Sequence, residues 1–272
     1  MVRIAIAGAA GRMGRSLIEA FTNNTGDSKV TVATVLTEDP SLGMDSGILA
    51  MGIANGVLNV SALNDCIDDF DVLVDFTSPS ATIEHLACCQ KHHKALVIGT
   101  TGLNDEQLEM VRDAGRQIPI LISPNMSVGV NLCFGLVEAA AKAVGKDYDI
   151  EVYEAHHRNK KDSPSGTALK LGQLVAKTLG RNFKEVSIFG RKGVSDDRDL
   201  RTIGFSTVRA GDIVGDHTVI FAGQGERIEI THKASNRMTF ASGAVKAANW
   251  IFGKPAGIYS MQDVLELDNP DQ

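Results

Sequence analysis

The chain has 272 residues, and its 43% hydrophobic and 22% charged content is that of a folded protein, which excludes a disordered or collagen-like chain. At about 100–200 residues per domain, the length predicts one or two domains. The 27 basic and 33 acidic residues give a net charge of −6, which argues against a nucleic-acid-binding surface over the whole chain and still permits a local basic pocket.

The apolar runs and the cysteines indicate the compartment. The chain enters the apolar run Val2–Gly8 without the basic segment and longer apolar segment of a signal peptide. No apolar run reaches the roughly 18 residues that a membrane span requires. The four cysteines have neither C-x-x-C spacing nor a zinc pattern with histidine. We therefore expect a cytoplasmic protein with no metal, no membrane association and no nucleic-acid partner.

Short apolar runs alternate with helical segments over the first half of the chain. The pattern predicts strands at 3–7, 30–36, 72–76, 96–98 and 120–122, and helices at 12–21, 82–92 and 105–116. Strands that alternate with helices imply right-handed crossovers and a parallel sheet covered on both faces. We therefore predict a doubly wound α/β domain of the Rossmann type over residues 1–128.

The pattern changes after Val130. Helices are predicted at 131–144 and 167–179, and strands at 149–155, 186–189, 203–208, 213–221 and 227–231. Most of these strands follow one another without intervening helices, and a Gly-rich turn joins the last two, so we predict an antiparallel or mixed sheet in a second, α+β domain over 129–239. A further helix is predicted at 240–252, and with it the segment 240–272 is expected to return to the first domain.

The first predicted strand runs directly into a glycine-rich turn that opens the first helix. The turn reads Gly8-Ala9-Ala10-Gly11-Arg12-Met13-Gly14, a G-x-x-G-x-x-G variant of the dinucleotide fingerprint. Glycines let backbone N–H groups approach a pyrophosphate at the positive end of the helix dipole. The position of the turn between strand and helix favours a dinucleotide site over a ligand-free turn.

Further cofactor contacts are expected where later strands end. The second strand is followed by Thr37 and Glu38, and the carboxylate of Glu38 would suit the two ribose hydroxyls of NAD, whereas Arg12 would suit the 2′-phosphate of NADP. Three more loops, at 75–79, 99–102 and 123–126, fall at the same edge of a parallel sheet. Their candidate cofactor residues are Gly99, Thr100, Thr101, Ser123, Pro124, Asn125 and Met126.

The most unusual stretch is Glu154–Ala168. Five cationic or potentially cationic residues lie within six positions of this acidic chain: His156, His157, Arg158, Lys160 and Lys161. Ser165 can cap the helix that follows, and the backbone N–H groups of Gly166 and Thr167 would then point toward a carboxylate. A histidine and a pocket lysine can exchange protons near neutral pH. We therefore predict a site for a small, multiply anionic substrate rather than a solvated basic face, and we assign structural or surface roles to the histidines outside this stretch.

Together these segments resemble the dihydrodipicolinate reductase family over nearly the whole chain. The resemblance includes Gly11–Arg15, the loops at 75–77 and 97–102, the segment 127–131, and the runs at 208–215 and 231–235. The block His-His-Arg-x-Lys-x-Asp-x-Pro-Ser-Gly-Thr-Ala, which begins at His156, is its most specific part.

This resemblance implies an oxidoreductase that uses NADH or NADPH to reduce the dicarboxylate 4-hydroxy-tetrahydrodipicolinate to tetrahydrodipicolinate, with loss of water, in diaminopimelate and lysine biosynthesis. It implies that His156 is a proton donor and acceptor, that Lys160 is a second proton donor, and that His157, Gly166 and Thr167 contact substrate. It also implies that the second domain binds substrate and builds a homotetramer.

The chain departs from the family's pattern at the end of the second strand, where Thr37 stands in a place that is often acidic and Glu38 follows it. Either residue could meet the ribose, so the sequence leaves the preference between NADH and NADPH open. Two other function classes fit less well. A short-chain dehydrogenase would need a Tyr-x-x-x-Lys pair, which none of the three tyrosines provides. A nucleotide sensor without catalysis would have no use for His156 and Lys160 beside an anion-binding helix start.

Overall fold

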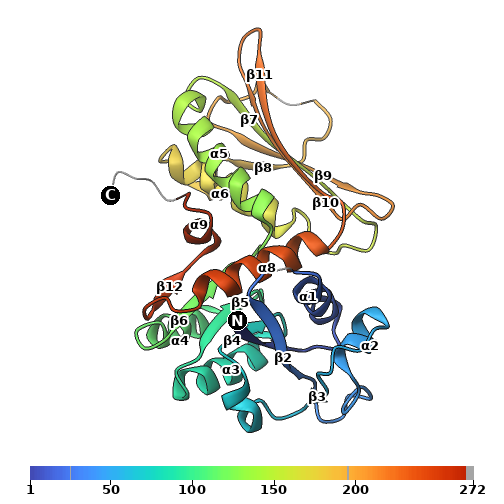
Figure 1. The fold of residues 1–272 in the computed structure, drawn as a ribbon. Helices are drawn as coiled ribbons and strands as arrows, with labels where there is room; N and C mark the ends of the chain where they lie inside the picture. Colours follow the sequence, from blue (N-terminus) through green and yellow to red (C-terminus); the bar gives the residue numbers. More distant parts are fainter. Residues whose placement is uncertain (25, 195, 268–272) are drawn as a thin grey trace. The chain divides into compact units, whose positions relative to one another are not determined.

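The computed structural model describes residues 1–24, 26–194 and 196–267. The chain divides into two compact units, drawn in Figure 1. Unit 1 comprises Met1–Val128 together with the chain from Arg237 onward, and unit 2 comprises Gly129–Asn236. The first unit is therefore built from two separate stretches of the sequence.

Unit 1 is organised around a parallel sheet in the order β12-β6-β5-β4-β1-β2-β3. Its strands are β1 (Val2–Ala7), β2 (Ser28–Thr34), β3 (Asn59–Val60), β4 (Val72–Asp75), β5 (Ala95–Ile98), β6 (Pro119–Ile122) and β12 (Gly257–Tyr259). From β1 the chain builds outward through β2 and β3, and then returns to add β4, β5 and β6 on the other side. This reversal beside β1 is the place where open α/β sheets bind their ligands.

Helices cover both faces of this sheet. They are α1 (Arg12–Asn23), α2 (Ser46–Met51), the 3-10 helix η1 (Leu63–Asp69), α3 (Pro79–Lys91), α4 (Asp105–Ala114), α8 (Met238–Ile251) and α9 (Met261–Val264). Alternate residues of a strand point to opposite faces. Accordingly, Ile4 and Ile6 of β1 belong to the core formed with α1 and α8, whereas Ala5 and Ala7 belong to the core formed with α3 and α4.

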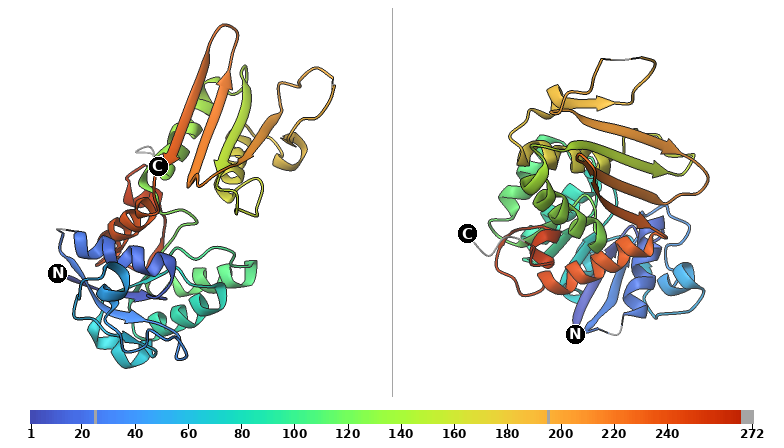
Figure 2. Two further views of the ribbon diagram at one scale, coloured as in Figure 1. Left: turned by 90° about the vertical axis from the view of Figure 1, so that its right-hand side faces the viewer. Right: turned by 90° about the horizontal axis from the view of Figure 1, so that it is seen from above.

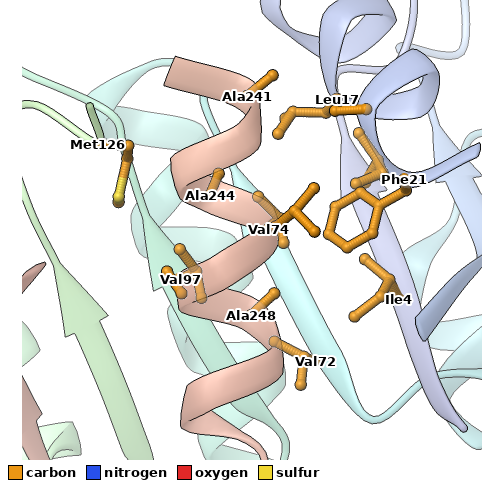
Figure 3. Close-up of a cluster of buried hydrophobic side chains, with 14 of the residues drawn as sticks. Ile4, Leu17, Phe21, Val72, Val74, Val97, Met126, Ala241, Ala244 and Ala248 are labelled. Atoms are coloured by element: carbon orange, nitrogen blue, oxygen red, sulfur yellow. The ribbon is translucent and has the colours of Figure 1, made fainter. Parts of the chain in front are cut away.

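Helix α8 comes from the end of the chain and packs on strands from its beginning. Figure 3 shows Ala241, Ala244 and Ala248 of α8 among the side chains of this core. Small residues let the helix approach closely, and one such approach is at Gly243, where an added Cβ would lie 1.8 Å from the carbonyl oxygen of Met126.

Unit 2 holds a mixed sheet in the order β11-β10-β7-β9-β8. Its strands are β7 (Asp149–His156), β8 (Ser187–Phe189), β9 (Ile203–Arg209), β10 (Gly215–Ala222) and β11 (Arg227–Ala234), and its helices are α5 (Val128–Val144), α6 (Gly166–Thr178) and α7 (Phe183–Val186). Strand β10 is antiparallel to β7 and β11, whereas β9 is parallel to β7 and β8. The long hairpin of β10 and β11 is plain in Figure 2. Residues of α5 and α6 form a core with Ile150, Val152 and Phe205 of the sheet.

The predicted fold class, a Rossmann-type parallel sheet with a second unit on a mixed sheet, is confirmed. The segment predicted as a helical return is only partly helical, because Gly257–Tyr259 forms β12 beside β6 after α8 ends. Three residues are too few to show a strand periodicity, and the same holds for the two residues of β3. Within the described ranges, no helix combines the length and the apolar character that crossing a membrane demands.

Candidate functional site

The glycine-rich turn between β1 and α1 depends on its glycines. Gly8 has a φ of +66°, and a Cβ there would lie 2.9 Å from the Thr77 methyl group. A Cβ on Gly14 would lie 2.2 Å from the carbonyl oxygen of Gly8. Helix α1 begins after Gly11, and no side-chain hydrogen bond caps it. The turn therefore brings bare backbone to the N-terminus of a helix, as a pyrophosphate site requires.

A cavity of about 340 Å³ lies beside this turn. Its walls come from the ends of β1, β2 and β4 and from α3, and they are formed by Gly8, Ala10, Gly11, Thr34, Val35, Leu36, Asp39, Phe76, Thr77, Ser78, Ala81 and His85. These strands lie on both sides of the reversal in strand order, where a dinucleotide is expected. The volume and the largely apolar walls suit one half of such a cofactor.

The loops after β4 and β5 are tied together through the buried carboxylate of Asp75. It accepts hydrogen bonds from the Thr77 backbone N–H at 2.9 Å and from His85 Nδ1 at 2.9 Å. The Thr77 N–H also reaches Thr100 Oγ1 at 3.0 Å. Burial alone would raise the pKa of Asp75, but the bonds from His85 and Thr77 outweigh it and the pKa is lowered. His85, for which the sequence indicated no binding role, is therefore part of the cavity wall and holds its loop in place.

The candidate cofactor residues all follow strands at one edge of the sheet. Gly8, Ala10 and Gly11 line the cavity, whereas Ala9 is buried, Met13 is half-buried and Arg12 is exposed. Gly99, Thr100 and Thr101 follow β5, and Ser123, Pro124, Asn125 and Met126 follow β6. Glu38 is exposed in the turn after β2 and is not part of the cavity wall, which at this point is formed by Leu36 and Asp39.

The second candidate site lies in unit 2, where β7 ends at His156 and the basic stretch begins. Lys160 and Lys161 differ in their surroundings. The Lys160 side chain is 23% exposed, and its Nζ lies 2.9 Å from Asp162 Oδ1. Lys161 is exposed. Of the two lysines, Lys160 is therefore the one that is partly buried and paired with a neighbouring carboxylate.

His156 is 7% exposed and is held by a carboxylate. Its Nδ1 lies 2.5 Å from Glu154 Oε2. Burial lowers the pKa of His156, the hydrogen bond and the charge of Glu154 raise it, and the charges of Lys160 and Arg209 lower it again, so that the net shift is downward. The imidazole is therefore largely neutral at neutral pH, which lets it accept a proton as well as return one.

Glu154 is itself clamped between two neighbouring elements. Arg209 at the end of β9 donates to both of its oxygens, Nη1 to Oε2 at 2.9 Å and Nη2 to Oε1 at 2.8 Å. The backbone N–H of Ser165 donates to Oε1 at 3.1 Å. Burial would raise the pKa of Glu154, but Arg209 and His156 lower it below its usual value. The Glu154 carboxylate is therefore ionised where it contacts His156.

The start of α6 completes this site. The Ser165 hydroxyl accepts a hydrogen bond from the Ala168 N–H at 3.3 Å, as the predicted cap should. An added Cβ on Gly166 would meet nothing within 4 Å, so the helix start is accessible at this residue. Ser165 Oγ also lies 2.9 Å from His217 Nε2, which places His217 beside His156. The structure thus gathers His156, Lys160 and the helix start in one unit.

Sequence reasoning missed Arg209 and His217 and gave no role to Glu154. Strand pairing brings them together, since Arg209 of β9 pairs with His156 and His217 of β10 pairs with Glu154. The alternation along β7 is the one local signal, because it places Glu154 on the same face as His156 and the core residue Val152.

Comparison with known proteins gives consistent results. A family profile described as "Dihydrodipicolinate reductase, N-terminus" matches residues 2–126, and one described as "Dihydrodipicolinate reductase, C-terminus" matches residues 129–265. The chain is 55% identical over 267 residues to the 4-hydroxy-tetrahydrodipicolinate reductase of Hahella chejuensis, an alignment that covers 98% of this chain and 100% of the relative. The protein of the same name from Pseudomonas fluorescens is 52% identical over 267 residues with the same coverage.

Among solved structures, the dipicolinate-bound dihydrodipicolinate reductase from Paenisporosarcina sp. TG-14 matches with a TM-score of 0.76. The two chains are 25% identical, and the match covers 97% of this chain and 98% of that one.

Proposed function

The chain belongs to the dihydrodipicolinate reductase family, and on that premise we propose that it reduces 4-hydroxy-tetrahydrodipicolinate to tetrahydrodipicolinate in diaminopimelate and lysine biosynthesis. The reaction consumes one NADH or NADPH and one proton, and it releases one water and the oxidised cofactor. The observation that carries the proposal is the arrangement in unit 2, where His156 is hydrogen-bonded to an ionised carboxylate and is followed by Lys160 and by the N-terminus of α6.

Unit 1 supplies the groups that would hold a nicotinamide cofactor. The glycine-rich turn at Gly8 and Gly11 would let a pyrophosphate approach the backbone. A side chain at Gly8 would collide with Thr77, so this position stays free of side-chain atoms. The adjoining cavity would take the adenosine half, and the loops at Gly99–Thr101 and Ser123–Met126 would position the nicotinamide half. When bound, the cofactor supplies the hydride.

Unit 2 supplies the groups that would hold the substrate and move its protons. A carboxylate of the substrate would accept hydrogen bonds at the N-terminus of α6, from Gly166 and Thr167, and His157 would add a further contact. His156 would exchange a proton with the substrate through Nε2, since Nδ1 is engaged by Glu154. Lys160 would donate the second proton, and its ammonium would favour the dianionic substrate.

We also propose that the protein is a cytoplasmic homotetramer. The sheet of unit 2 supports the assembly because the face opposite its core leaves large apolar side chains exposed, among them Tyr153 and Ile188. Such side chains are typical of a surface that a second copy covers. Both cofactors are proposed to work, with NADH favoured if the Glu38 carboxylate reaches the ribose and NADPH accepted more readily if Thr37 takes that place.

The test is a coupled assay with freshly generated 4-hydroxy-tetrahydrodipicolinate, in which oxidation of NADH and of NADPH is followed separately by absorbance. We expect substrate-dependent oxidation with either cofactor, and we expect His156→Gln to remove nearly all of it. Oxidation that does not depend on the added substrate, or none with either cofactor, would overturn the proposed function.

A further inference from the structure

Glu154 and His156 form a pair that the strand itself builds. Both lie on β7, two residues apart, and alternate residues of a strand share a face. Glu154 is 1% exposed, and its Oε2 lies 2.5 Å from Nδ1 of the histidine. The hydrogen bond that one ring nitrogen makes determines which nitrogen carries the proton. The ionised carboxylate therefore places the proton of the neutral ring on Nδ1 and leaves the lone pair on Nε2.

The carboxylate is held from two other elements, so that it cannot turn away from the ring. Arg209 of β9 donates hydrogen bonds to both carboxylate oxygens of Glu154, and the Ser165 N–H at the start of α6 donates one to Oε1. A two-pronged guanidinium contact fixes the plane of a carboxylate. The backbone of β10 restricts the position of the His156 ring, because a Cβ on Gly215 would lie 3.0 Å from His156 Nε2.

We propose that Glu154 is a positioning residue for the reaction: it fixes the tautomer and orientation of His156, and Arg209 keeps its carboxylate ionised and in place. This inference rests on the proposed role of His156 in proton transfer. During transfer the proton moves between the substrate and Nε2, the Nδ1–H stays with the ring, and Glu154 stabilises the imidazolium without taking its proton. A carboxylate that acts on a catalytic histidine in this way is a recurring device in acyl transfer, where it orients the ring and fixes its tautomer.

The charged and titratable groups around His156 shift its pKa in opposite directions, which gives the proposal two distinct tests. They are Glu154 on its own strand, Arg209 on β9, His217 on β10 and Lys160 in the following loop. Glu154 raises the pKa of His156, so replacing it by a neutral residue lowers that pKa. Arg209 lowers the pKa of His156, so replacing it by a neutral residue raises that pKa. A general loss of structure would not move the two variants in opposite directions.

Strand β7 also provides a matched control. Glu151 is a glutamate on the opposite face of the same strand, and it forms ion pairs with Arg191 and Arg198. Its pKa is lowered because these arginines outweigh the effect of burial, just as Arg209 and His156 outweigh it for Glu154. The substitution Glu151→Gln therefore removes an ion-paired carboxylate from β7 without touching His156.

The experiment compares the wild type with Glu154→Gln, Arg209→Gln and Glu151→Gln. Nitrogen-15 NMR of histidine-labelled protein reports the tautomer and the pKa of His156, whose signals are assigned by their loss in His156→Gln. Steady-state assays give kcat and KM, and thermal unfolding checks that each variant folds. We expect Glu154→Gln to move the proton of neutral His156 to Nε2, to lower its pKa, and to reduce kcat by at least about tenfold with KM for the substrate within about threefold.

For Arg209→Gln we expect the wild-type tautomer and a raised pKa of His156, and for Glu151→Gln we expect wild-type values throughout. The proposal is overturned if Glu154→Gln keeps the wild-type tautomer and pKa, or if Glu151→Gln loses as much kcat as Glu154→Gln. The tautomer needs no substrate to be measured. It therefore decides the role of Glu154 separately from the coupled assay, whose failure in the wild type would overturn the function instead.

Discussion

The rings of His156 and His217 meet edge to face, with their centroids 5.0 Å apart and their planes at 71°. His217 is 6% exposed, and burial followed by the nearby charge of His156 lowers its pKa to about 3. His217 is therefore neutral throughout the physiological range. His217 packs against His156, the proposed proton-transfer group, as an uncharged ring. Of these two histidines, only His156 can change its charge near neutral pH.

Replacing His156 by glutamine tests its role in proton transfer directly. We expect kcat to fall by about 10² to 10⁴, the usual contribution of a general acid or base. The dissociation constant for NADH, measured by fluorescence titration, should stay within about twofold, since the glycine-rich turn belongs to the other unit. A variant with near-normal kcat would exclude His156 from the mechanism.

The two neighbouring lysines form a matched pair of variants. Lys160→Ala should lower kcat/KM at least about tenfold more than Lys161→Ala, a difference of about 1.4 kcal/mol in transition-state stabilisation. The reason is that Lys160 is partly buried and forms an ion pair with Asp162, whereas Lys161 is exposed. Steady-state kinetics with the substrate varied at saturating cofactor measures both. Equal small effects would mean that the whole basic stretch is a solvated surface.

The lowered pKa of His217 predicts a loss of stability in acid. The unfolded chain takes up a proton on this residue near pH 6.5, whereas the folded chain does so only near pH 3. Its contribution is therefore present above about pH 6.5 and is lost as the pH falls toward 3. Between pH 7 and pH 4.5 the wild type should lose about 2 kcal/mol more free energy of unfolding than His217→Gln.

Urea unfolding of both proteins at the two pH values measures this difference. The groups that bear on His217 are His156, Glu154, His232 and Lys160, and all of them are retained in the variant. Parallel pH dependences in the two proteins would show that His217 does not titrate in this range.

Cofactor preference is tested at Glu38, the exposed carboxylate in the turn after β2. The wild type should use both cofactors with a modest advantage for NADH, below about tenfold in kcat/KM or about 1.4 kcal/mol. Glu38→Ala should shift the ratio toward NADPH, because it removes a charge that would repel the 2′-phosphate. Glu106→Ala serves as the control, since Glu106 is an exposed carboxylate of α4 that is not part of the cavity wall. A ratio unchanged in Glu38→Ala would make Glu38 an ordinary turn residue.

The parts that sequence could predict are those encoded locally. The turn at Gly8–Gly14 and the cap at Ser165 depend on a few adjacent residues, and both form where they were expected. The environment of His156 depends instead on strand pairing across the sheet of unit 2, which places Arg209 and His217 next to β7 from more than fifty positions away. A single sequence does not specify which strands pair or in what register, so these contacts became visible only in the fold.

Unit 1, which is proposed to hold the cofactor, is discontinuous in sequence, and Gly243 lies where its two stretches pack together. Residues of α8 (Figure 3) and of α9 bury one face of the sheet. All strands of that sheet except β12 come from the first half of the chain. A fragment that ends near Val128 would lack α8 and would leave Val72 of β4 and Val97 of β5 without their cover on that face. The carbonyl of Met126, in one of the proposed cofactor loops, is held against a helix more than one hundred positions further along the chain. Substitutions that tune cofactor binding can therefore arise in α8, outside every segment that would touch the cofactor.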